Sequence, residues 1–351
     1  MSNFYIEAIE STMITLSKEG EPTAGTVKYS IGSDNPTTNY NYGNSINLTT
    51  GQKCYFTITS TTSDFGHWDY LYFTSTGKIK VGGNLSSLIG GNTAIPRHYC
   101  FHGLFLSCKT LVDASSLNFG SITNFNSKTF VFSSMFEDCT SLTTPPELPA
   151  TTLANGCYAK MFSGCENLLV APKLPAITLA NSCYSSMFSD CENLLVAPEL
   201  PATTLAFACY LNMFCRCGLI TPPELPATTL ADSCYMYMFE SCWNIKLSTT
   251  QTEVYTTPYR IPSSGTGTTS GNSLEGMFES TGSPEWPSYA TPTINTTYYI
   301  PSPPVLIVTY DDDIIYTDDD KCNITLPTID KKMSGDINVI VSVEDGNNIA
   351  Y

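Results

Sequence analysis

The stretch CYAKMFSGCENLLVAPKLPAITLANSCYSSMFSDCENLLVAP, from Cys157 to Pro198, contains nearly the same sequence twice. Met-Phe pairs recur along the chain and begin at Met135, Met161, Met187, Met213 and Met238, with spacings of 26, 26, 26 and 25 residues. Cys-Tyr pairs and Leu-Pro-Ala triplets recur with the same spacing. Three independent markers with one period exclude chance, so the chain contains an internal repeat of about 26 residues.

Each repeat is expected to consist of a helical turn and a short strand. From Cys157 to Cys165 the apolar residues follow the i, i+3, i+4, i+7 spacing that is typical of one helix face. The next segment, residues 167–176, is apolar and contains two prolines, which indicates a brief strand that ends in a turn. A unit this small cannot bury its own apolar face, but stacked copies can.

The stacking predicts buried ladders in which each residue lies above its equivalent in the next repeat. The predicted ladder residues are Cys157, Met161, Phe162, Cys165, Cys183, Met187, Phe188, Cys191, Cys209, Met213, Phe214, Cys217, Cys234, Met238, Phe239 and Cys242. A degenerate copy, Cys100 to Cys108, precedes them, and a trace, Gly276 to Ser280, follows. Atypical terminal copies are expected, because they cap a stack.

The order Phe-x-x-Cys-x-x-Leu, then a short apolar segment, then Pro, resembles the BspA-type leucine-rich repeat. The Met-Phe-x-x-Cys variant is similar to bacterial surface-protein repeats of that group, which occur in Bacteroidetes and in their phages. The resemblance covers about residues 100–247. It implies an α+β fold, a right-handed leucine-rich-repeat-like solenoid, that serves binding or display and not catalysis.

Four roles were weighed for the 14 cysteines: metal ligands, disulfides, nucleophiles and packing. Zinc sites need closely spaced pairs, whereas these partners are eight residues apart. Disulfides need an oxidising compartment, and a nucleophile needs a neighbouring base that recurs with the repeat. We therefore expect reduced, buried cysteines that pack as small apolar residues. His98 and His102 flank Cys100, and we expect polar capping positions there and not a metal site.

Residues 1–95 lack the repeat. Short segments of alternating polar and apolar residues, each ended by turn-forming residues, predict a small β-sandwich module. The aromatic cluster near residue 70 provides the only ligand-binding candidates, Trp68, Tyr70 and Tyr72, whose rings could stack on a sugar if they are exposed.

Residues 96–247 form the predicted solenoid, residues 248–300 irregular capping coils and a linker, and residues 301–351 a second β module. The last segment resembles a β module found near the ends of phage tail and virion proteins, on the stretch TIDKKMSGDINVIV. The triplets Asp311–Asp313 and Asp318–Asp320 lack the Gly and Glu spacing of an EF-hand, and they leave a calcium site and a solvated hairpin rim as alternatives.

Composition and charge limit the classes of binding partner that we expect for this chain. The formal net charge is −16, which disfavours nucleic acid and anionic membrane surfaces. The sequence contains no run of about 18 apolar residues, so we expect no membrane insertion. The first residues do not resemble a signal peptide. Only 14% of residues are charged, and the abundance of Thr, Tyr and Asn suits a polar, sugar-rich partner.

These observations predict a non-enzymatic protein with no catalytic residues, cofactor or bound metal. The expected role is that of a phage virion accessory protein, in a fibre, head decoration or tail, which meets a host cell-surface glycan or protein. Its other partners would be virion proteins and, by analogy with fibres, further copies of itself. The alternative is a bacterial cell-surface adhesin with the same repeat. A hydrolase in the flanks was the third hypothesis, and the sequence shows no constellation for it.

Overall fold

The computed structural model describes residues 2–20, 25–59, 70–92, 94–119, 122, 125, 127–282, 291–301, 305–310, 313–318, 338–342 and 348–350. The chain divides into two compact units. The first consists of Met1–Lys246 and Arg260–Thr296, and the second of Leu247–Tyr259 and Thr297–Tyr351. The predicted boundary near residue 95 lies inside the first unit.

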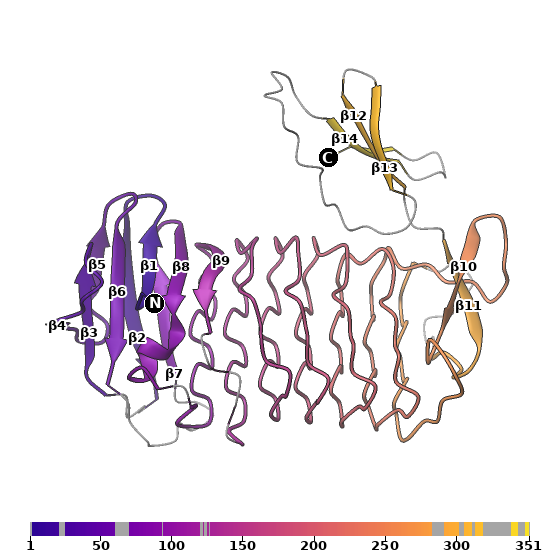
Figure 1. The fold of residues 1–351 in the computed structure, drawn as a ribbon, viewed down its shortest axis with the longest axis horizontal. Helices are drawn as coiled ribbons and strands as arrows, with labels where there is room; N and C mark the ends of the chain where they lie inside the picture. The colour runs from indigo at the N-terminus through magenta and orange to yellow at the C-terminus, as the bar shows by residue number, and fades with distance from the viewer. Residues whose placement is uncertain are drawn as a thin grey trace. The chain divides into compact units, whose positions relative to one another are not determined.

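The first unit begins with two facing sheets (Figure 1). A six-stranded sheet has the order β4-β3-β6-β1-β8-β9, and a three-stranded sheet has the order β5-β2-β7. The strands are β1 (Phe4–Ala8), β2 (Thr12–Glu19), β3 (Val27–Ile31), β4 (Thr38–Asn39), β5 (Ser45–Leu48), β6 (Lys53–Ile58), β7 (Tyr70–Ser75), β8 (Ile79–Asn84) and β9 (Leu111–Asn118). Rings from both sheets meet between them: Phe73 lies 5.5 Å from Phe4 and 5.1 Å from Phe56. Burial alternates along β1, as period-2 patterning requires.

The sheets continue directly into the repeats. After β8 a short 3₁₀ helix, η1 (Leu85–Ile89), is capped by the Asn84 side chain and ends at Gly90 in the left-handed conformation. Strand β9 belongs to the first, degenerate repeat, and it pairs parallel with β8, from Ile79 opposite Leu111 to Asn84 opposite Asn118. Backbone hydrogen bonding then passes from coil to coil. We call the coils in Cys100–Lys246 and Arg260–Ser280 the repeat stack.

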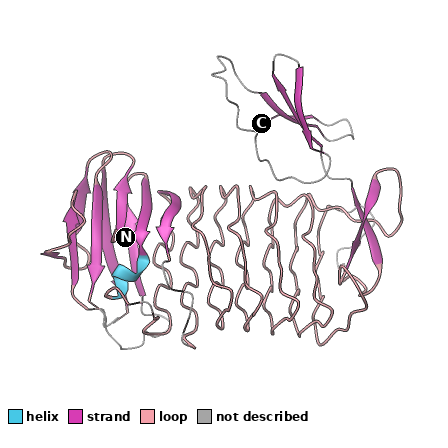
Figure 2. Ribbon diagram, viewed as in Figure 1, coloured by secondary structure: helices cyan, strands magenta, loops and turns pink. Residues whose placement is uncertain are grey.

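The predicted fold class is wrong. The chain is not an α+β, leucine-rich-repeat-like solenoid, because the repeats contain no helix (Figure 2). Residues 127–254 form neither a helix nor a strand longer than a single bridge. A series of isolated parallel bridges links one threonine per coil: Thr152, Thr178, Thr204, Thr229 and Thr268. Elsewhere in the described residues, sheets predominate and η1 is the one helical element.

The segment predicted as a helical turn is a chain of tight turns. Its N–H groups alternate between two kinds of acceptor. Met135 N donates to Phe132 O at 3.3 Å within the coil, and Phe136 N donates to Met161 O at 2.9 Å in the next coil. Every fourth residue has a positive φ, for example Gly156, Lys160 and Gly164 at 59°, 57° and 73°. A right-handed helix cannot accommodate these residues.

The predicted short strand of each repeat is an extended segment without ladder pairing. In residues 167–176 two prolines, Pro172 and Pro175, remove backbone donors, so a continuous parallel ladder between coils cannot form. Asparagine side chains supply part of the missing hydrogen bonding. Asn193 Nδ2 donates to Glu166 O at 2.9 Å, and Asn244 Nδ2 donates to Gly218 O at 2.9 Å.

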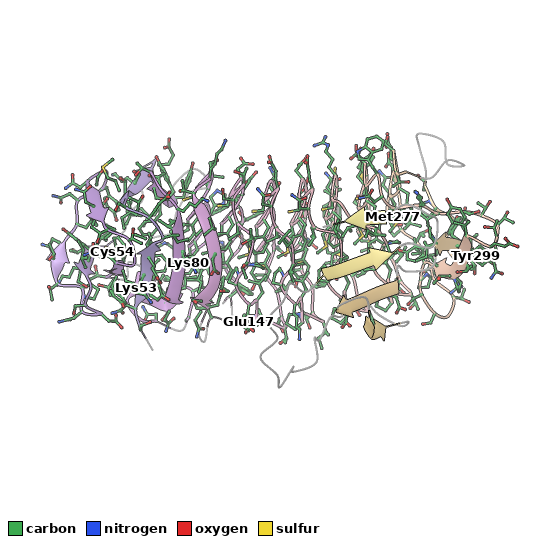
Figure 3. The ribbon with its side chains drawn as sticks, turned by 90° about the horizontal axis from the view of Figure 1, so that it is seen from above. Lys53, Cys54, Lys80, Glu147, Met277 and Tyr299 are labelled. Atoms are coloured by element: carbon green, nitrogen blue, oxygen red, sulfur yellow. The ribbon has the colours of Figure 1, made fainter. Side chains whose placement is uncertain are left out.

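Buried ladders hold the coils together. The Phe162 ring stacks between Phe136 and Phe188, with centroids 5.5 and 5.7 Å apart and ring planes within 5° of parallel. A second ladder stacks Tyr158 on Tyr184 at 5.9 Å. All sixteen predicted ladder residues are buried. The trace that begins at Gly276 continues the phenylalanine ladder through Phe278, and its Met277, labelled in Figure 3, is fully buried.

The second unit contains two further sheets. Strands β10 (Tyr255–Arg260) and β11 (Thr297–Pro301) pair with each other. A four-stranded sheet has the order β13-β12-β14-β15, formed by β12 (Val305–Tyr310), β13 (Asp313–Asp318), β14 (Asn338–Ser342) and β15 (Asn348–Ala350). Asp313 and Asp318 lie at the ends of β13, and the other members of the two aspartate triplets lie outside the described residues. The alternatives of calcium site and hairpin rim therefore stay open.

Candidate functional site

Five half-buried aromatic rings form a continuous surface where the three-stranded sheet meets the first coils. In order of contact they are Tyr72, Tyr70, His102, Tyr99 and Phe130, with centroid separations of 5.8, 5.4, 5.7 and 5.2 Å. We call these five residues the aromatic strip. It combines residues from a strand with residues from two successive coils.

Strand alternation places the two tyrosines of β7. Leu71 and Phe73 are buried between the sheets, so Tyr70 and Tyr72 lie on the outer face. The first coil is fixed beside them, because Phe73 N donates to Leu104 O at 2.8 Å. That bond places the first coil so that the rings of Tyr70 and His102 are in contact, although the two residues are 32 positions apart in the sequence.

Glycines make room for two rings of the strip. A Cβ atom at Gly103 would lie 3.1 Å from the Tyr70 ring, and one at Gly156 would lie 2.2 Å from the Phe130 ring. Both glycines also have a positive φ. The Tyr70 and Phe130 rings therefore lie against bare backbone, which fixes their positions without covering them.

Hydrogen bonds orient the histidine of the strip. His102 Nδ1 lies 2.8 Å from Ser133 O and 2.7 Å from Ser133 Oγ. A carbonyl oxygen can only accept a hydrogen bond, so Nδ1 carries the hydrogen and donates to Ser133 O. The neighbouring His98 bonds instead to Thr129. Among the described residues, no group of three or more His, Cys, Asp or Glu side chains is arranged to hold a metal ion.

A carboxylate flanks the strip. In the β2–β7 register Glu19 lies opposite Tyr70 and Ser17 lies opposite Tyr72. Burial, and secondarily the Glu19 charge, raises the pKa of Tyr70, and burial raises the pKa of Tyr99. Both phenols are therefore protonated donors at neutral pH. Apolar ring faces beside hydroxyl donors and a carboxylate acceptor suit a ligand that has C–H faces and many hydroxyl groups.

Sequence reasoning located part of this surface. Tyr70 and Tyr72 lie in it, whereas Trp68 falls outside the described residues. Tyr99, His102 and Phe130 were missed as ligand candidates. The signal for Tyr99 and His102 was the degenerate first repeat, in which polar and aromatic residues replace the regular pattern, whereas Phe130 belongs to the next coil and had no such signal.

Twelve of the described cysteines lie in the interior of the repeat stack, and Cys54 is buried in β6; they do not form a reactive site. The thirteen cysteines in the described part of the chain are free and buried. Burial raises the pKa of Cys157 and Cys209 to about 12. Thiolates are the nucleophilic form, so these thiols are unreactive at neutral pH.

Comparison with known protein families, with curated proteins and with solved structures finds no match. The resemblance to BspA-type repeats therefore stays a prediction. In the described residues, no helix has the length and apolar character needed to cross a membrane.

Proposed function

We propose that this chain is a binding and display protein in which the aromatic strip recognises a host cell-surface glycan. The observation that carries the proposal is the contact of five half-buried rings beside the Glu19 carboxylate. Partly exposed rings in mutual contact are held in place before a ligand arrives, so little ordering entropy is lost on binding.

The repeat stack supports this role as a rigid scaffold. Each coil donates backbone hydrogen bonds to the next coil, and two buried ring ladders stack along it. Such a scaffold holds the strip in one arrangement. We propose that the chain acts within a phage virion, in contact with other virion proteins and with further copies of itself. A bacterial surface adhesin is the second candidate, carried by the resemblance of its repeats.

The strip is tested by binding of the full chain to purified cell-surface polysaccharide from a Bacteroides-type host. Tyr72→Ala and Tyr99→Ala each remove one ring of the strip. Each is expected to weaken binding about tenfold, which corresponds to about 1.4 kcal/mol. Trp243→Ala is the matched control, because Trp243 is an exposed aromatic side chain of the stack outside the strip.

Equal binding by the Tyr72, Tyr99 and wild-type proteins would contradict the strip as the glycan surface. Equal losses in the Trp243 variant would show nonspecific adsorption through exposed rings. The biological setting is tested separately by mass spectrometry of purified particles from an infected culture. Recovery of the intact chain in virions supports the virion role, whereas recovery only from uninfected cell surfaces supports the adhesin.

A further inference from the structure

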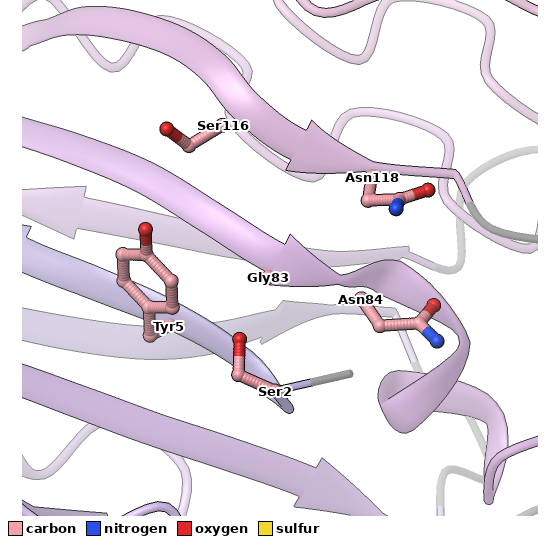
Figure 4. A pocket seen from close by; sticks show the side chains of 6 residues that line it. All are labelled: Ser2, Tyr5, Gly83, Asn84, Ser116 and Asn118. Atoms are coloured by element: carbon pink, nitrogen blue, oxygen red, sulfur yellow. The ribbon is translucent and has the colours of Figure 1, made fainter.

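A polar hollow of about 250 Å³ opens on the outer face of the six-stranded sheet (Figure 4). Six residues line it: Ser2, Tyr5, Gly83, Asn84, Ser116 and Asn118. They come from the chain start, from β1, from the end of β8 and from β9. The hollow lies on the parallel β8–β9 seam, where the register shifts twice.

Two glycines create the space. A Cβ atom at Gly82 would lie 2.5 Å from the Tyr5 hydroxyl oxygen and 2.9 Å from Ser116 Cβ. Gly83 has φ +79°, and its Cβ atom would lie 2.0 Å from Asn3 O. A side chain at either position would displace Tyr5 or the chain start. The Gly82–Gly83 pair thus lets the Tyr5 phenol lie across β8 towards β9.

The Tyr5 side chain is held before any ligand binds. Lys53 Nζ lies 4.1 Å from the ring centroid, and Glu7 holds the same ammonium group at 3.4 Å. The Tyr55 ring also contacts the Tyr5 ring, with centroids 5.6 Å apart. Because the ammonium group covers the ring, the phenol meets a ligand through its hydroxyl group and edge, and not by stacking.

The lining is neutral and rich in hydrogen-bonding groups. Ser2, Tyr5 and Ser116 contribute hydroxyl groups that can donate and accept, and Asn84 and Asn118 contribute amides, of which Asn84 Oδ1 already accepts from Ser86 N as the cap of η1. The nearby charges on this face are paired, as in Lys80–Asp113 at 3.7 Å. None of the six described lining residues carries a positive charge, so they offer a phosphate or carboxylate ligand no ion pair. A neutral ring with several hydroxyl groups would find hydrogen-bonding partners in the Ser2, Tyr5 and Ser116 hydroxyl groups.

We propose that this hollow is a binding site for a single neutral sugar ring. Its volume is just below that of pockets for drug-sized ligands, so it fits one ring and not an extended chain. The site is distinct from the aromatic strip, because it lies on the outer face of the other sheet. The two sites give the chain two separate contacts with a glycan-coated surface, a gain in avidity without a larger interface.

Ligand-observed NMR on the full chain tests the site with methyl glycosides of glucose, galactose, mannose and N-acetylglucosamine. At least one is expected to bind saturably with Kd on the order of 1 mM. Ser116→Trp fills the hollow and is expected to abolish that signal. Tyr5→Phe removes one hydroxyl group and is expected to weaken binding about fivefold to tenfold.

Ser115→Trp is the matched control, since Ser115 is the adjacent exposed residue of β9 and does not line the hollow. It must bind like the wild type, and so must Tyr72→Ala, which alters only the strip. Circular dichroism confirms that each variant is folded. Absence of saturable binding by the wild type, full binding by Ser116→Trp, or loss in Ser115→Trp would overturn the proposal. If the wild-type chain binds a methyl glycoside but not the polysaccharide, the proposal for the aromatic strip is rejected and the proposal for the hollow stands.

Discussion

At the scale of single residues, the ladder cysteines do more than fill space. The thiol of one coil donates to the carbonyl of a phenylalanine in the preceding coil: Cys165 Sγ to Phe136 O at 3.1 Å, and Cys217 Sγ to Phe188 O at 2.8 Å. Cysteine is thus a small apolar residue that also carries a weak donor. The packing role could be predicted from spacing, but the carbonyl contact depends on the stagger between coils, which no single repeat reveals.

Replacing Cys165 by serine tests this role. The hydroxyl oxygen sits on a shorter bond, lies farther from Phe136 O and loses more hydration on burial than a thiol. We expect Cys165→Ser to lower the free energy of unfolding by about 1–3 kcal/mol, measured as a shift of the urea midpoint at unchanged m-value.

The chain offers a control with the same chemical change. Cys215 occupies the position that Ser163 and Ser189 hold in the two preceding coils, and its thiol faces Glu240 Oε2 at 3.6 Å. Cys215→Ser is therefore expected to change the free energy of unfolding by less than about 0.5 kcal/mol. Equal destabilisation by both substitutions would show that the thiol-to-carbonyl contact contributes nothing specific.

At the scale of the elements, sequence pattern predicted the burial of each coil but not its conformation. Cys157, Met161 and Cys165 recur at an interval of four, as do Tyr158 and Phe162. Over eight residues a period of 4 is nearly indistinguishable from the helical 3.6. The left-handed residues that decide between them include Lys160, whose residue type gives no such signal.

The candidate sites, too, could be predicted only in part from local sequence pattern. Alternation along β7 indicated that Tyr70 and Tyr72 share a face. The ring contact between Tyr70 and His102 depends instead on how the first coil packs beside the strand, and the Tyr5 hollow depends on parallel pairing of β8 with β9. The hydropathy pattern along a single segment does not indicate which distant segments pair, so the sequence alone did not predict the hollow beside Tyr5.

The phenylalanine ladder is the element that joins coils, and Phe162→Ala tests it. Its ring is fully buried between Phe136 and Phe188. Truncation leaves a cavity that the two neighbouring coils cannot close, and we expect a loss of about 3–5 kcal/mol. Phe207→Ala is the control, because Phe207 belongs to the same stack and is 50% exposed. Equal thermal stability of Phe162→Ala and wild type would contradict the ladder as the stabilising core.

At the scale of the whole molecule, the buried thiols couple stability to alkaline pH. Burial raises the pKa of Cys100, Cys157, Cys209 and Cys242 to about 12, from an ordinary value of 9.0. Between these values the folded chain binds more protons than the unfolded chain, so stability falls as pH rises. The contribution of these thiols is complete below pH 9 and is lost progressively towards pH 12.

We therefore expect the fold to collapse within about two pH units above pH 9. Each such thiol contributes a slope of up to about 1.4 kcal/mol per pH unit, so four together remove roughly 10 kcal/mol within that range, which is comparable to the total stability of an ordinary domain. Circular dichroism under reducing conditions would follow the transition. Recovery of the native spectrum on return to pH 8 would show that the loss came from ionisation and not from oxidation of the thiols. Cys157→Ala sharpens the test: it should lower stability at pH 7 yet reduce the steepness of the alkaline loss. A native spectrum that persists at pH 11 would contradict this prediction, because it would show that ionisation of these thiols in the unfolded chain costs less than the stability of the stack.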